Sequence, residues 1–286
     1  MVWEWYLPAF MTLAGIGAFL YLFGVWLGHR EIFAPPAKFA TYLSWMVLAL
    51  AGVFVLLDLG KPAAAGTGIV HILNVFNRWP SSPISFETSM LLATLGFGLL
   101  CTLFYLAGWR RGWPRSVVEI LGAIPAMILA FGYAGFLELG AFTTNPLWHT
   151  VMLSLLTLSL AIAAAAAVIN LPNVGFFADL LPNFASKEAA GLLGLITRSF
   201  LVIALILTPL YLLTTGGYAS LLLGGSAGVK FWGALVLGIV VPLVIGFSRG
   251  IPQEQAKWVA LAQIVLVVFG TYLFNLAVLQ AGQLLL

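Results

Sequence analysis

The feature that most constrains this chain is a series of apolar runs, each about 20 residues long and nearly free of charge. An α-helix of that length matches the thickness of the hydrocarbon core of a bilayer. The runs are continuously apolar rather than alternating, which favours spanning helices over the strands of a membrane barrel. Eight runs are found, at residues 7–28, 39–57, 86–108, 117–138, 147–169, 189–213, 230–247 and 257–281.

Composition supports lipid as the solvent of this chain. Of the 286 residues, 62% are hydrophobic and only 7% are charged, whereas a soluble domain is about 25% charged. Too few polar groups exist to cover a surface in water. The sequence therefore predicts an all-α integral membrane protein with about eight transmembrane helices, forming one transmembrane domain over 1–286. Its net charge of +3 is attributed to basic loops and not to nucleic-acid binding.

The distribution of Lys and Arg predicts the orientation of the helices. The loops after the first, third, fifth and seventh predicted helices hold eight of the twelve basic residues, and the opposite side holds three. The positive-inside rule places the richer side in the cytoplasm, so both termini and the 58–85 connection are expected outside. The densest basic cluster, which includes Arg115, is expected in the loop after the third helix. Trp148, Trp232 and Trp258 are expected at the membrane interface, at helix starts.

Arg198, the remaining basic residue, lies about ten residues into the sixth predicted helix. An arginine at the bilayer centre costs roughly 2.5–3.5 kcal/mol on insertion scales, and such residues usually mark a pathway or a paired site. The alternative is that the helix begins later and that Arg198 reaches the cytoplasmic surface by extending its side chain.

Acidic residues gather at the predicted outer ends of the helices, where a solvated rim and a functional site explain them equally well. Glu119 lies near the cytoplasmic start of the fourth helix, as part of a proton route or of the interface. The acidic residues at the predicted outer ends are Glu4, Asp58, Glu87 and Glu138.

Histidine and cysteine positions give no support for a bound metal. A haem anchor needs paired axial ligands at membrane depth, whereas His29, His71 and His149 fall in loops or at helix ends. The single cysteine, Cys101, lies in an apolar run and is interpreted as a small buried side chain. Neither haem nor a metal is expected in this chain.

The order of short motifs resembles one known family. Asp58-Leu59-Gly60-Lys61-Pro62 ends the second helix, and Ser82-Pro83-Ile84-Ser85 precedes the third. Gly132-Tyr133-Ala134-Gly135 ends the fourth, and Asn145-Pro146-Leu147-Trp148 follows. In this order they are similar to the polysulfide reductase membrane-subunit family, also called NrfD-like. The resemblance covers roughly residues 5–170, and the last three helices match by pattern only.

The resemblance implies a membrane anchor that reacts with quinone (menaquinone or ubiquinone) near the outer face and has no metal of its own. Helices one to four, about 7–138, would form the quinone-binding bundle, and helices five to eight, about 147–281, a second four-helix bundle. An iron–sulfur subunit would dock on the outer face and exchange electrons with a molybdopterin catalytic subunit that acts on the terminal substrate. The location implied is a bacterial or archaeal cytoplasmic membrane.

The resemblance also implies roles for single residues. Tyr133 matches a quinone contact, and Asp58 and Arg198 match positions linked to the quinone or to a proton route. Some relatives use a histidine in the first helix, but none is present here, so Glu4, Tyr6 or a loop residue such as His71 would supply that hydrogen bond. The 58–85 connection would dock the iron–sulfur subunit through His71, Asn74, Asn77, Arg78, Ser82 and Ser85.

Two other classes of protein remain open from the sequence. A secondary transporter of a small anion or a proton-coupled solute would explain Arg198, the many helix glycines and kinks at Pro209 and Pro242. A purely structural anchor without a quinone site would explain the same helices.

Overall fold

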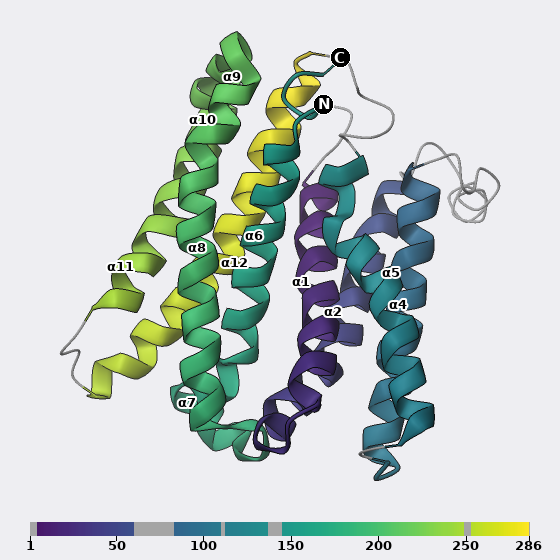
Figure 1. The fold of residues 1–286 in the computed structure, drawn as a ribbon. Helices are drawn as coiled ribbons and strands as arrows, with labels where there is room; N and C mark the ends of the chain where they lie inside the picture. The colour runs from purple at the N-terminus through teal and green to yellow at the C-terminus, as the bar shows by residue number, and fades with distance from the viewer. Residues whose placement is uncertain (1–4, 60–82, 110–111, 137–144, 249–252, 286) are drawn as a thin grey trace.

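The computed structural model describes residues 5–59, 83–109, 112–136, 145–248 and 253–285 (Figure 1). Within these ranges the regular secondary structure is entirely helical. Eight helices in the described part of the chain are long and apolar enough to cross a membrane. The prediction of a multi-pass helical membrane protein is therefore confirmed at the level of length and composition.

The first four spans all begin earlier than hydropathy predicts, and the difference is largest for α2 and α5. Helix α2 begins before 39, and α5 begins before 117, because each has proline in its first turn, where a missing N–H group has no helical acceptor to lose. Arg115 consequently lies in the first turn of α5, and its placement in a loop was wrong. The spans are α1 (Tyr6–Gly28), α2 (Ala34–Leu59, after a 3-10 turn at Glu31–Phe33), α4 (Pro83–Leu106) and α5 (Trp113–Phe136).

The fifth and sixth spans are α6 (Val151–Ile169) and α8 (Lys187–Thr215). Helix α6 begins at Val151 and not at 147, because the Thr150 side chain accepts a hydrogen bond from the Met152 backbone N–H at 3.3 Å and caps the helix there. Short helices join the long ones: Leu171–Asn173, α7 (Gly175–Leu180) and Pro182–Phe184 before α8, then Gly216–Tyr218 and α9 (Ala219–Leu223) after it.

The seventh span is a composite helix, and the eighth is α12 (Gln253–Gln283). The seventh span runs from α10 (Gly225–Gly233) through a π-helical segment, η7 (Ala234–Val240), into α11 (Val241–Phe247). Pro242, the second residue of α11, has no N–H group for the regular helical bond, so the sequence-based expectation of an irregularity here agrees with the π-helical stretch. Helix α8, by contrast, continues through Pro209.

Glycines let η7 and α12 cross with backbone against backbone. A Cβ added to Gly238 would lie 2.5 Å from the Cα of Gly270, a separation that real side chains do not show. Small residues at such crossings permit the close approach that holds membrane helices together, because lipid offers no hydrophobic drive between them.

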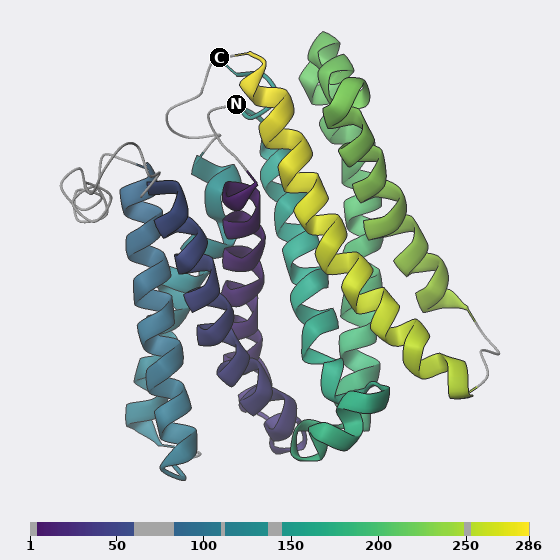
Figure 2. The same cartoon turned by 180° about the vertical axis from the view of Figure 1, so that it is seen from behind.

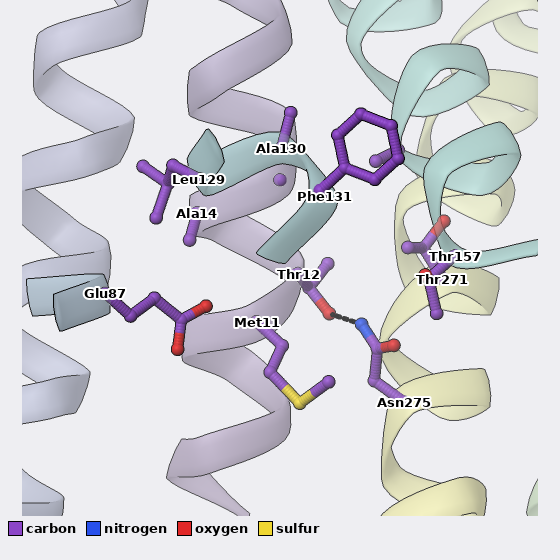
Figure 3. Close-up of a pocket in the computed structure, with 12 residues that line it drawn as sticks. Met11, Thr12, Ala14, Glu87, Leu129, Ala130, Phe131, Thr157, Thr271 and Asn275 are labelled. Carbon is purple, nitrogen blue, oxygen red and sulfur yellow. Dashed lines mark hydrogen bonds between the residues drawn. The ribbon is translucent and has the colours of Figure 1, made fainter. Parts of the chain in front are cut away.

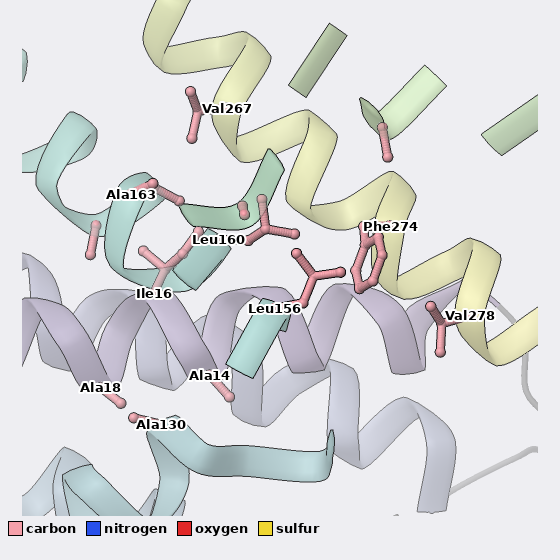
Figure 4. Close-up of a cluster of buried hydrophobic side chains, with 14 of the residues drawn as sticks. Ala14, Ile16, Ala18, Ala130, Leu156, Leu160, Ala163, Val267, Phe274 and Val278 are labelled. Carbon is pink, nitrogen blue, oxygen red and sulfur yellow. The ribbon is translucent and has the colours of Figure 1, made fainter. Parts of the chain in front are cut away.

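Helices α1 and α6 occupy the centre of the molecule. Helix α1 contacts α2, α5, α6 and α12, and it has the highest buried share together with α6 (Figures 1 and 2). A Cβ on Gly15 would lie 3.2 Å from the Cβ of Ala161, so the two helices meet through small residues. The apolar side chains of α1, α5, α6 and α12 fill the space around this seam, the contact between α1 and α6 (Figure 4).

Trp148 is not an interfacial residue, in contrast to the expectation from its place before a helix. Its side chain is 0% exposed, and its indole Nε1 donates to the Val278 carbonyl of α12 at 3.1 Å. The Asn145 side-chain amide donates to the Gly282 carbonyl at 3.0 Å. The turn before α6 is thus fixed to the end of α12. Trp232 and Trp258 are exposed in the described chain, and their place at the membrane interface stays a prediction.

The start of α1 and the end of α12 lie at the same end of the molecule (Figure 1). The side of the membrane that this end faces, and the division of the helices into two bundles of four, stay predictions.

Candidate functional site

A buried carboxyl group marks the strongest candidate site. Glu87 lies one turn into α4, and its side chain is 2% exposed. Figure 3 shows it pointing from α4 toward α1. Its Oε2 atom is buried and has no hydrogen-bond partner among the described residues. A buried carboxyl without a partner is costly to keep, so such a group calls for a functional explanation.

Five helices surround the cavity beside Glu87. Its wall is formed by residues of α1, α4, α5, α6 and α12. On the far side of the cavity, the Asn275 amide of α12 donates to the Thr12 hydroxyl of α1 at 2.9 Å (Figure 3). That hydroxyl in turn donates to the Pro8 carbonyl at 2.8 Å. The cavity therefore has a carboxyl group on one side and an amide–hydroxyl pair on the other.

The size of this cavity restricts what it can hold. Its volume is about 30 Å³, and one water molecule needs about 10–15 Å³. The cavity has room for one or two water molecules and not for a quinone ring. A ring would have to bind beside it, with water connecting it to Glu87.

Helix α5 contributes to the wall of the cavity and also bears Tyr133. Leu129, Ala130 and Phe131 of α5 line the cavity, and Tyr133 lies two residues further along the same helix. The side chain of Tyr133 lies outside the described residues, as does that of Asp58 at the end of α2. Their roles stay predictions.

The remaining predicted site residues are described only in part. Tyr6, at the start of α1, is 7% exposed, and its ring lies 5.9 Å from that of Trp5. Ser85 is 2% exposed, and its carbonyl accepts from the Ser89 hydroxyl at 2.8 Å, so its side chain is not at the surface of the described chain. The other predicted quinone and docking residues lie outside the described residues: Glu4, His71, Asn74, Asn77, Arg78 and Ser82.

A second polar cluster lies at the opposite end of α4 and α5. Arg115 Nε donates to Glu119 Oε1 at 2.7 Å, and Arg115 Nη2 donates to the Tyr105 hydroxyl at 2.7 Å. Arg115 and Glu119 are 5% and 7% exposed. The charge of Glu119, which was expected on a proton route or at the interface, is thus paired inside the chain.

Buried polar atoms also follow the seam between α2 and α4. Within the described ranges, the hydroxyls of Thr88, Thr102 and Tyr42 and the indole N–H of Trp45 are buried without a hydrogen-bond partner. Tyr42 lies at the Tyr105 end of the seam, with ring centroids 6.2 Å apart, and Thr88 follows Glu87. Water is the usual partner of such atoms in a folded interior.

Arg198 does not belong to the Glu87 site. It lies on α8, where Nη1 donates to the Gly246 carbonyl of α11 at 2.8 Å and Nε donates to the Gly194 carbonyl at 3.1 Å. It lines two other cavities and not the one beside Glu87. The structure therefore separates Arg198 from the position where quinone is expected.

Sequence reasoning found Glu87 only as one of several outer acidic residues, and it missed Thr12 and Asn275. An asparagine within the apolar run Leu273-Phe274-Asn275-Leu276 was the available signal. A search of protein-family models and of curated proteins finds no match to this chain.

Proposed function

We propose that this chain is the quinone-reactive membrane subunit of a multisubunit respiratory oxidoreductase. It exchanges electrons between the membrane quinone pool and a peripheral iron–sulfur subunit of a molybdopterin-type enzyme. The observation that carries the proposal is the buried Glu87 carboxyl beside the helix that bears Tyr133, because its Oε2 atom has no hydrogen-bond partner among the described residues. The motif order, similar to the polysulfide reductase membrane subunits, supplies the redox context.

The chemistry explains why a buried carboxyl is useful here. Oxidation of a quinol releases two electrons and two protons. The electrons leave to the iron–sulfur subunit, and the protons must pass to groups of this chain. Tyr133 is proposed to hydrogen-bond a ring oxygen, and Glu87 to accept a proton through water in its cavity. A carboxyl group within water-mediated reach of the substrate suits this general-base role.

The proposal includes a topology. The first four spans form the quinone-binding bundle and the last four a second bundle, and both termini face outward from a bacterial or archaeal cytoplasmic membrane. Asp58 lies in the last turn of α2, which would face that outer side, and would connect the site to the aqueous phase. The 58–85 connection would then meet the iron–sulfur subunit.

The test is purification in mild detergent, followed by lipid extraction with quinone analysis and identification of the subunits that copurify. Quinone in near-stoichiometric amount, together with an iron–sulfur protein, supports the proposal. Quinone-free preparations with the iron–sulfur partner still bound indicate a structural anchor. Absence of both refutes the redox assignment.

One observation favours a second candidate, a secondary transporter. The α10–η7–α11 span is interrupted by a π-helical segment, and transporters often place interrupted helices at their binding sites. Uptake of a small anion or a proton-coupled solute by proteoliposomes of the purified chain would identify this function.

A further inference from the structure

Among the described residues, no carboxylate balances the positive charge of Arg198. In the described part of the chain its Nε and Nη1 atoms donate to two backbone carbonyls, those of Gly194 and Gly246. Within the described ranges no ion pair joins it to an acidic side chain. A guanidinium group has five N–H donors, so three remain after these two bonds. Both the charge and the free donors call for an anionic partner.

The level of Arg198 in the membrane follows from α11. Lys187 begins α8 eleven residues before Arg198, which alone would place the guanidinium group deep in the bilayer. Its partner Gly246, however, lies in the last turn of α11, which ends at Phe247. Arg198 therefore lies level with the end of the seventh span, and lipid head groups are expected where a span ends. Helix α8 continues past this level.

A polar cavity lined by residues of α6, α8, α11 and α12 adjoins Arg198. Its volume is about 250 Å³, far above the roughly 10–15 Å³ that a single water molecule needs. Two glycines of α8 create this room, since a Cβ on Gly191 or Gly194 would meet no atom within 4 Å. The side-chain amides of Asn170 and Gln263 also line the cavity and supply further hydrogen-bond donors.

An apolar groove between α8 and α11 also adjoins Arg198. It has a volume of about 590 Å³ and shares Arg198 and Gly246 with the polar cavity. Its wall includes Leu195, Ile203 and Phe247, which are 55%, 39% and 62% exposed. A charged polar cavity that continues into an apolar groove has the form of a site for an amphiphile with an anionic head and an acyl chain.

We propose that Arg198 and the adjoining cavity bind the phosphate of a net-anionic phospholipid whose acyl chain lies in the groove between α8 and α11. A net-anionic lipid is favoured over a zwitterionic one because no carboxylate among the described residues pairs with Arg198, whose guanidinium carbon lies 5.6 Å from the centroid of the Phe247 ring, whereas a zwitterionic head group brings its own cation. Basic pockets between membrane helices commonly bind anionic head groups. This inference does not depend on the proposed quinone chemistry.

The test is native mass spectrometry of the purified full-length chain, equilibrated with equal amounts of phosphatidylglycerol and phosphatidylcholine. The wild-type protein retains phosphatidylglycerol in preference to phosphatidylcholine. Arg198→Gln reduces that preference about tenfold, as expected for the loss of one charge-assisted contact. The matched control, Lys187→Gln, removes one positive charge from an exposed position of the same helix and leaves the preference unchanged.

A second variant tests the cavity and leaves the arginine in place. Gly191→Leu fills the space beside Arg198 without a clash at its Cβ, and leucine is a better helix former than glycine. It gives the same loss of preference, and it decides the matter if Arg198→Gln does not fold. The proposal is wrong if the wild-type protein shows no preference, or if the folded variants keep it. It is equally wrong if inorganic phosphate displaces the lipid, which would identify a site for a free anion.

Discussion

Glu87 and Glu119 are two buried carboxyl groups for which the structure predicts opposite mutational effects. Glu119 is paired with Arg115 at 2.7 Å, with side chains 9% and 6% exposed. Replacing Glu119 with glutamine leaves a buried arginine without its counter-charge, at a cost of about 3–5 kcal/mol in the free energy of unfolding. Glu87 has no ion pair among the described residues, so Glu87→Gln removes no such contact and changes stability by less than about 1 kcal/mol.

Turnover should respond in the reverse order. If Glu87 accepts the proton of the quinol, Glu87→Gln lowers quinone-linked turnover by about 100-fold or more, the range of general acid–base contributions. Glu119→Gln should change the turnover of the correctly folded fraction little, because Glu119 lies at the other end of α5. The assay is turnover with a soluble quinone analogue on the assembled complex, with stability measured by denaturation of the same samples. Turnover of Glu87→Gln within about threefold of wild type would refute a proton-transfer role.

Three further predictions address the quinone contact and the packing of the second half. Tyr133→Phe should remove most quinone-linked turnover while the complex still assembles, which activity and gel filtration measure together; unchanged turnover would exclude a role for this phenol. Gly238→Ala should destabilise the chain by about 1–3 kcal/mol in a denaturation series, because its new methyl group meets the backbone of Gly270; equal stability would show that the two helices separate without cost. Trp148→Phe should cost about 1 kcal/mol through the lost bond to Val278, and an unchanged denaturation midpoint would contradict that bond.

The spans were predictable because the length of an apolar run is a one-dimensional property of the sequence. The side of each helix that faces inward was not predictable, since helices such as α1 and α6 are apolar all around and periodicity therefore gives no direction. For this reason Glu87 could not be separated from a solvated rim, and Trp148 was placed at the interface. Arg115 was assigned to a loop because hydropathy does not recognise a helix start that contains proline.

The candidate site was predictable to a smaller extent than the fold. Motif order indicated helix α5 and Tyr133, but it gave no account of the Asn275–Thr12 pair, which joins residues 263 positions apart in the chain. A contact of that separation depends on how α12 packs on α1. Arg198 was singled out from the sequence as unusual, but its contact with the Gly246 carbonyl at the end of α11 depends on how α8 packs on α11 and could not be predicted from its own helix.

The contact between α1 and α6 has a consequence for how this chain tolerates sequence change. Large apolar side chains on the outward sides of α4, α8 and α10, such as Leu92, Leu195 and Val229, are exposed in the described chain, so most apolar residues serve equally well there. At Gly15 and Ala161 the two helices are so close that a Cβ on Gly15 would lie 3.2 Å from the Cβ of Ala161, so a side chain added there requires its neighbour to shift. Saturation mutagenesis should therefore find a narrow band of intolerant positions along this seam, where only the smallest residues survive, beside surfaces that accept nearly any hydrophobic exchange.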